Sequence, residues 1–198
     1  MLSIEEGETA VKHAREVIDA HVKRKSTSAR NLPSSFSERK GVFVTLNTIP
    51  QKNLRGCIGI PEPIMPFKEA LIEAAESACN DPRFSPLREE ELDSVVVEVT
   101  ILTTPELIKV DRPKEYLQKI KIGRDGLILK KSFYGGLLLP QVPVEWNWDV
   151  EEFLAQVCIK AGVLPDAWLE EDTKIYKFQG QIFCETEPHG KIVERPLA

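Results

Sequence analysis

Histidine is scarce in this chain, and the shortage restricts the chemistry that the sequence can support. The 198 residues include 3 histidines. His13 and His21 fall in a segment with helical periodicity, and His189 lies in a turn-prone stretch beside Pro188 and Gly190. None of them is near a cysteine in sequence, so a cysteine–histidine dyad has little support as a hypothesis.

Paired cysteines and long apolar runs are also missing. The 4 cysteines, Cys57, Cys79, Cys158 and Cys184, are widely separated and include no C-x-x-C pair. This spacing matches neither a zinc knuckle nor a disulfide framework, so we expect no metal site and reduced thiols. Met1–Glu6 lacks the apolar core of a signal peptide, and no run approaches ~18 consecutive apolar residues. These features predict a cytoplasmic protein with no membrane span.

Positive charge is not in excess either. The chain has 26 lysines and arginines against 31 aspartates and glutamates, which gives a net charge of −5. Proteins that bind nucleic acid present a basic surface, so we do not expect nucleic-acid binding. Apolar residues at 42% and charged residues at 29% are ordinary for a folded domain. The length predicts a single domain over residues 1–198 with a full core.

Hydrophobic periodicity predicts an α+β protein with a largely antiparallel sheet flanked by helices. Helices are expected at Ile4–Lys25, Pro66–Asn80, Pro113–Lys119 and Asp149–Ala161. Strands are expected at Val42–Asn47, Leu54–Ile60, Val95–Leu102, Gly126–Lys131 and Leu137–Leu139, with a final pair, Lys174–Gln179 and Gln181–Thr186, around Gly180. No strand–helix–strand unit repeats, which argues against a parallel sheet.

The segment Leu54-Arg55-Gly56-Cys57-Ile58-Gly59 points most clearly to a site. Two glycines weaken a strand, so we expect another group to approach this backbone closely. Strand alternation places Arg55, Cys57 and Gly59 on one face. Because a nearby guanidinium favours a thiolate, Cys57 is a candidate nucleophile or redox thiol. The alternative is a small buried core residue.

Two further charged residues accompany Cys57 as candidates. Arg55 either binds an anionic ligand group or forms a structural ion pair across the sheet, with Glu98 as its expected partner. Glu98 lies on the mixed face of Val95–Leu102 and is the second catalytic candidate, as a general base.

The proline-fixed loop Asp81–Leu87 follows a predicted helix and contributes a third charged candidate. Asp81 is expected to organise the turn through its own backbone. Arg83 either contacts a ligand or forms an ion pair.

Gln141 is the last candidate, because Trp146-Asn147-Trp148 follows it closely. Two indoles near an amide resemble a pocket wall that hydrogen-bonds and stacks a ligand. The alternative is that the indoles anchor this loop to the helix Asp149–Ala161.

Several of these segments together resemble the AMMECR family over about residues 4–186. The matching segments are Phe43–Leu46, Leu54–Gly59, Asp81–Leu87, Glu98-Val99, Leu139–Val142, Trp148, Glu152–Leu154 and Lys160–Gly162. The resemblance implies a larger lobe, a smaller lobe roughly within 112–165, and a cleft between them lined by the signature residues. Some relatives carry this domain fused to Memo-like and radical S-adenosylmethionine domains, which implies work within an enzyme system. The family's molecular activity is not established, so the resemblance names no reaction or cofactor.

Two functional hypotheses therefore stay open. In the first, the protein is an enzyme that binds a small polar or anionic molecule and uses Cys57 or Glu98 for group or proton transfer. In the second, it is a binding or interaction module without chemistry of its own, working with a partner enzyme system. The ligand-contacting residues expected in either case are Arg55, Gly56, Gly59, Arg83 and Gln141.

Overall fold

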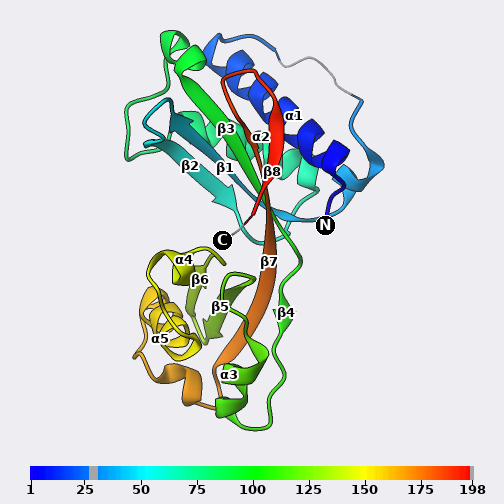
Figure 1. The fold of residues 1–198 in the computed structure, drawn as a ribbon. Coiled ribbons are helices and arrows are strands. Elements are labelled where there is room, and N and C mark those ends of the chain that lie inside the picture. The colour runs from blue at the N-terminus through cyan, green and yellow to red at the C-terminus, as the bar shows by residue number, and fades with distance from the viewer. Residues whose placement is uncertain (27–30, 197–198) are drawn as a thin grey trace. The chain divides into compact units, whose positions relative to one another are not determined.

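The computed structural model describes residues 1–26 and 31–196, which form two compact units (Figure 1). Unit 1 comprises Met1–Leu102 and Gln181–Pro196, and unit 2 comprises Thr103–Gly180. Unit 2 extends on both sides beyond the range 112–165. The fold is α+β, with antiparallel strand pairs flanked by helices, which confirms the predicted class.

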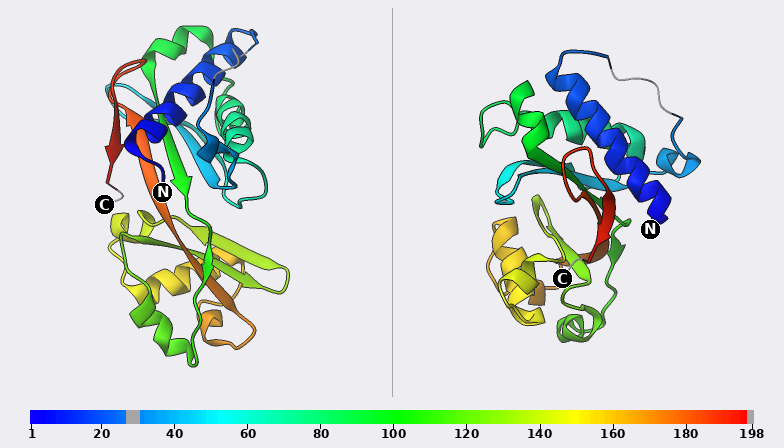
Figure 2. Two further views of the ribbon diagram at one scale, coloured as in Figure 1. Left: turned by 90° about the vertical axis from the view of Figure 1, so that its right-hand side faces the viewer. Right: turned by 45° about the horizontal axis from the view of Figure 1, so that its top comes forward.

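Unit 1 is a sheet with two long helices on one face. Its strand order is β2-β1-β3-β7, with β8 paired to β7. The strands are β2 (Leu54–Ile60), β1 (Gly41–Thr48), β3 (Val95–Leu102), the end of β7 (Lys174–Glu185) and β8 (Ile192–Arg195), and the helices are α1 (Ile4–Val22) and α2 (Phe67–Cys79). Figure 2 shows α1 and α2 on the same side of these strands.

The core of unit 1 lies between that face of the sheet and the two helices. Every second residue of β1 and β3 is buried there, including Val44, Leu46 and Val97, against Val17 and Leu71 of the helices. The apolar stripe predicted for the first helix is the face that packs, as its 3.6-residue period requires. The opposite face of the sheet, which carries Cys57, is therefore not the one that α1 and α2 cover.

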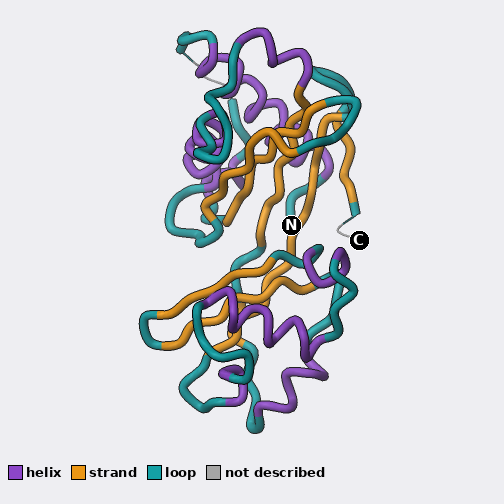
Figure 3. Tube along the Cα trace, turned by 90° about the vertical axis from the view of Figure 1, so that its left-hand side faces the viewer, coloured by secondary structure: helices purple, strands orange, loops and turns teal. Residues whose placement is uncertain are grey.

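Unit 2 is a smaller sheet with its own core. Figure 3 shows the hairpin of β5 (Asp125–Lys131) and β6 (Tyr134–Leu138) in this unit. β5 also pairs with the first part of β7, which pairs in turn with β4 (Glu106–Leu107). The remaining elements are α3 (Tyr116–Lys119), α4 (Val142–Glu145) and α5 (Val150–Ala161), with short 3-10 helices at Pro113–Glu115 and Ala167–Leu169.

Helix α5 begins and ends where its capping residues predict. The Asp149 side chain accepts a hydrogen bond from the backbone N–H of Glu152 at 2.8 Å. Gly162 ends the helix in the left-handed conformation, with φ 82°, which glycine adopts without steric cost. Phe153 and Val157 of this helix are fully buried in the unit 2 core.

One prediction about strands was wrong. Gly180 was expected to separate a final strand pair, but it lies inside the single strand β7. The Ile182–Glu185 stretch pairs with β8, which lies after the turn that contains Gly190. Both faces of β3 are buried, including the mixed face that carries Glu98.

No helix within residues 1–26 and 31–196 is long and apolar enough to cross a membrane.

Candidate functional site

Strand β2 lies at the edge of the unit 1 sheet, and the loop after α2 closes that edge. The backbone N–H of Cys57 donates to Asp81 Oδ2 at 2.9 Å, and Arg83 Nη2 donates to the Cys57 carbonyl at 3.2 Å. The peptide groups that an edge strand would leave open at Cys57 are thus hydrogen-bonded within the chain. The signature strand is held in place through its backbone.

Asp81 and Arg83 form a close ion pair at this edge. Arg83 Nη2 is 2.6 Å from Asp81 Oδ2, and Arg83 Nε is 3.0 Å from Oδ1. Asp81 also accepts the Arg83 backbone N–H at 3.0 Å, so it organises its turn as predicted. Hydrogen bonding from Arg83 holds the pKa of the buried Asp81 carboxyl well below its ordinary value. The Arg83 side chain itself is 56% exposed, so one side of its guanidinium faces solvent.

Arg55 forms an ion pair, but Glu98 is not its partner, and that prediction was wrong. Arg55 Nε and Nη2 donate to the two carboxylate oxygens of Glu91 at 2.8 and 3.0 Å. Glu91 lies in the 3-10 helix Glu89–Ser94. β1 separates β2 from β3, so Glu98 is two strands away from Arg55. The guanidinium that was expected to act on Cys57 is therefore engaged by a carboxylate.

Cys57, Thr45 and Glu98 form a row across three neighbouring strands. Thr45 of β1 is in register with Cys57 of β2 on one side and with Glu98 of β3 on the other. The Thr45 hydroxyl donates to Cys57 Sγ at 3.2 Å. The row lies on the face opposite α1 and α2, and the Cys57 side chain is partly exposed.

The electrostatic environment of Cys57 does not favour a thiolate, contrary to the prediction. Burial raises the pKa of its thiol, and the hydrogen bond from Thr45 and the charge of Arg83 lower it in part. The carboxylates of Glu98 and Asp81 raise this pKa further. The cation whose charge lowers this pKa is thus Arg83 and not Arg55.

Glu98 is 8% exposed and has a cationic partner from β8. Arg195 Nη2 lies 2.9 Å from Glu98 Oε2. Burial raises the pKa of Glu98, and the positive charge of Arg195 opposes that rise. Sequence reasoning missed Arg195 because no periodic signal marks the short β8. It also missed Thr45, although strand alternation between Phe43 and Leu46 places its side chain on the same face as Cys57.

The two signature glycines admit close neighbours, as predicted, and both neighbours belong to the chain. A Cβ atom on Gly56 would lie 2.3 Å from the Ala78 carbonyl oxygen, at the end of α2. A Cβ atom on Gly59 would lie 2.2 Å from the Phe43 ring. Gly59 shares the face of Cys57, whereas Gly56 faces the helices.

Gln141 belongs to unit 2, where it precedes α4. The rings of Trp146 and Trp148 stack with centroids 6.2 Å apart. Trp148 packs against the core that contains α5, as the anchoring alternative predicted, whereas Trp146 is 68% exposed. Among the described residues, the Gln141 side-chain oxygen is buried without a hydrogen-bond donor.

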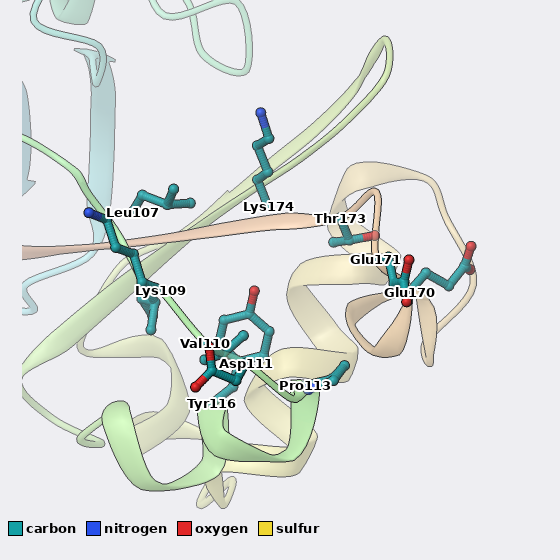
Figure 4. Close-up of a pocket in the computed structure, with 11 residues that line it drawn as sticks. Leu107, Lys109, Val110, Asp111, Pro113, Tyr116, Glu170, Glu171, Thr173 and Lys174 are labelled. Carbon is teal, nitrogen blue, oxygen red and sulfur yellow. The ribbon is translucent and has the colours of Figure 1, made fainter.

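Unit 2 also contains a hollow of about 390 Å³ that sequence reasoning did not find. Residues 107–116 and 170–174 line it, and Figure 4 shows its side chains. These two segments are far apart in sequence and carry no recognisable motif. In residues 1–26 and 31–196, no group of three or more histidine, cysteine, aspartate or glutamate side chains could hold a metal ion.

Comparison with known proteins places this chain among archaeal relatives. The family model AMMECR1 matches residues 11–183. Protein MJ0810 from Methanocaldococcus jannaschii is 61% identical over 198 residues, which cover 100% of this chain and 98% of the relative. The crystal structure of the uncharacterized protein PH0010 from Pyrococcus horikoshii matches with a TM-score of 0.88 and 52% identity, covering 98% of each chain. On the family match and these relatives, the chain belongs to the AMMECR1 family.

Proposed function

We propose that the protein is a binding module in which unit 1 takes a small polar or anionic ligand beside Cys57. In this proposal Cys57 acts as a neutral thiol and performs no nucleophilic chemistry. One observation carries it: the Arg55 guanidinium is engaged by Glu91, and besides burial the charges of Glu98 and Asp81 raise the pKa of the Cys57 thiol. A cysteine nucleophile needs a cation or a base to generate its thiolate.

The row of Cys57, Thr45 and Glu98 supplies contacts that such a ligand needs. Thr45 and Cys57 offer a hydroxyl and a thiol, and the partly exposed guanidinium of Arg83 attracts negative charge. A carboxyl with a raised pKa, like that of Glu98, donates a hydrogen bond when it is protonated. These groups support recognition of a ligand that carries both an acceptor and an anionic group.

A second candidate function is proton transfer by Glu98 on the bound ligand. Its support is the raised pKa of this buried carboxyl, because general acids and bases work best when their pKa lies near the working pH. In that case the positive charge of Arg195 opposes the rise in pKa and favours the ionised form of Glu98. Cys57 then contributes to the site by packing and hydrogen bonding.

We also propose a cytoplasmic setting and a link to Memo-like or radical S-adenosylmethionine partners. The four cysteines are all free, which suits a reducing compartment. The family analogy of fused domains supports a role beside an enzyme, which a binding module would fulfil by presenting its ligand.

Alkylation of Cys57 by iodoacetamide, followed site by site with peptide mass spectrometry across a pH series, tests the proposal. We expect the apparent pKa of Cys57 in the folded protein to exceed that in the denatured chain. Cys184, whose thiol is also partly exposed, is the internal control. A folded-state pKa below the denatured one would overturn the binding-module proposal and favour an enzyme.

Two arginine variants sharpen this experiment. Arg55→Gln should leave the Cys57 profile unchanged, because Arg83 and not Arg55 supplies the positive charge that lowers this pKa. Arg83→Gln should move the profile to higher pH, because it removes the positive charge that acts on the sulfur. Circular dichroism of both variants checks that they fold.

A further inference from the structure

The hollow in unit 2 has an apolar wall whose polar atoms are already satisfied. Ile108 and Tyr116 are 5% exposed and contribute to this wall together with Val110. The Tyr116 hydroxyl is hydrogen-bonded to the backbone of Ile175, and the Thr173 hydroxyl donates to the Ala167 carbonyl at 2.7 Å. This wall therefore suits an apolar group of a ligand.

The charged groups of the hollow carry both signs. Figure 4 shows Lys109 and Asp111 on one side and Glu170 and Glu171 on the other, with Lys174 between them. Glu170 is engaged by Lys131, whose Nζ lies 2.5 Å from its Oε2. Among the residues that the structure describes, the side chains of Lys109, Lys174 and Glu171 have no hydrogen-bond or ion-pair partner.

The unpaired charges of the hollow balance one another. Lys109 and Lys174 contribute two positive charges, and Glu171 and Asp111 contribute two negative charges. A hollow with balanced charges of both signs favours a ligand that itself carries both signs. A purely anionic ligand would meet repulsion from Glu171 and Asp111, and a purely cationic one from Lys109 and Lys174.

The volume limits the size of that ligand. Small-molecule sites range over about 300 to 1,000 Å³, and this hollow lies near the lower limit. A single amino acid or a dipeptide is therefore a better match in size than a dinucleotide cofactor.

We propose that the hollow binds a zwitterion of the amino-acid type with an apolar side chain. Its carboxylate lies toward Lys109 and Lys174, and its ammonium lies toward Glu171. Its side chain packs on the wall formed by Ile108, Val110 and Tyr116. The site lies entirely in unit 2, so the experiments that test it do not depend on the site proposed beside Cys57.

Titration of the ¹⁵N-labelled full chain, followed by NMR chemical shifts, tests this site with four probes. L-Leucine carries both charges and an apolar side chain, and we expect it to shift resonances of residues 107–116 and 170–174. The probe 4-methylpentanoate lacks the ammonium, 3-methylbutylamine lacks the carboxylate, and glycine lacks the side chain. We expect each of these three to bind at least about tenfold more weakly than leucine, a difference of roughly 1.4 kcal/mol.

Matched variants locate the two charges of the ligand. Lys174→Gln should weaken leucine binding about tenfold and should not weaken the binding of 3-methylbutylamine. Glu171→Gln should weaken leucine and spare 4-methylpentanoate. Lys160→Gln and Glu151→Gln, at exposed positions of α5 outside the hollow, are controls that should bind leucine like the parent protein.

Three results would overturn the proposal. Leucine at tens of millimolar could produce no saturable shift in these two segments. 4-Methylpentanoate or 3-methylbutylamine could bind as tightly as leucine, which would mean that one charge is not recognised. The Lys160→Gln control could weaken leucine binding as much as Lys174→Gln, which would indicate general charge attraction.

Discussion

The side chain of Asp81 holds the backbone of Cys57, because the buried Asp81 carboxylate accepts a hydrogen bond from the Cys57 N–H at 2.9 Å. Arg83, the ion-pair partner of Asp81, donates to the carbonyl of the same cysteine. The Cys57 sulfur accepts a hydrogen bond from the Thr45 hydroxyl on the neighbouring strand. The signature is thus a structural motif around the backbone of one residue, with the thiol presented beside it.

Replacing Asp81 should destabilise unit 1 at neutral pH. Asp81→Ala removes the acceptor for the Cys57 N–H and the ion-pair partner of Arg83, and we expect a loss of about 2 to 3 kcal/mol in unfolding free energy. Urea denaturation followed by circular dichroism measures this loss. A change below about 0.5 kcal/mol, the usual size for surface substitutions, would contradict the role assigned to Asp81.

The same carboxylate should contribute to acid unfolding. Because its pKa is lower in the folded protein than in the unfolded chain, its stabilisation is complete above the unfolded value of about 3.9 and is lost as pH falls below it. This linkage acts over roughly pH 5 to pH 2. Over that range the unfolding free energy of Asp81→Asn should therefore fall less than that of the parent protein. Glu73→Gln, at an exposed position of α2, is the matched control and should follow the parent.

Thr45→Val should make Cys57 less reactive. The Thr45 hydroxyl donates to the sulfur and lowers the pKa of the thiol, so its removal should raise that pKa further. At a fixed pH below that pKa, alkylation of Cys57 should slow several-fold, on the order of the effect of one weak hydrogen bond. Alkylation of Cys184 in the same sample should keep its rate, and equal slowing of both thiols would instead indicate a general change in the protein.

Arg195→Gln should reduce stability in a pH-dependent way. The pKa of Glu98 is raised in the folded state, so its ionisation opposes folding as pH rises above the unfolded value of about 4.3. Arg195 offsets that effect, because it stabilises the carboxylate at 2.9 Å. The variant should therefore be more destabilised at pH 7 than at pH 4, as measured by urea denaturation.

Glu98→Gln is the partner variant that isolates this pair. The glutamine in this variant carries no ionisable group. Adding Arg195→Gln to Glu98→Gln should therefore produce little further pH dependence of the unfolding free energy. A ¹³C-NMR titration of the Glu98 carboxyl gives its pKa directly. A value at or below the unfolded one would contradict both this prediction and the proton-transfer candidate.

Gly56→Ala should be more damaging than Gly59→Ala. The added methyl group at Gly56 would meet the Ala78 carbonyl, which α2 fixes, and we expect a cost of about 2 to 3 kcal/mol. At Gly59 it would meet the Phe43 ring, which is a side chain that can move. Adding Phe43→Leu should restore stability to Gly59→Ala and not to Gly56→Ala, and equal rescue of both would contradict the assignment of neighbours.

Local patterns predicted the elements well where a single periodicity dominates. The stripe of α1, the bounds of β3 and both ends of α5 follow from residue spacing and capping residues such as Asp149 and Gly162. The turn expected at Gly180 failed because glycine permits a turn without requiring one. The partners of β7 on either side of this glycine keep the strand extended.

Ion pairs between segments far apart in the sequence were harder to predict. Arg55 was expected to meet Glu98, since both lie on strands with suitable faces, but the strand order places β1 between them. Its partner Glu91 is 36 residues away in sequence, in a 3-10 helix. Arg195 and the hollow in unit 2 were missed for the same reason, because neither is marked by any local pattern.

The sequence by itself determined which side of each strand faces the helices, and that glycines must stand where the chain approaches itself. Those properties follow from backbone geometry, which repeats over two or 3.6 residues and needs no knowledge of distant partners. Only the tertiary structure decided which charges meet. Electrostatic pairing depends on distances across the sheet, and at Cys57 those distances place Asp81 and Arg83 on the backbone while burial raises the pKa of the thiol.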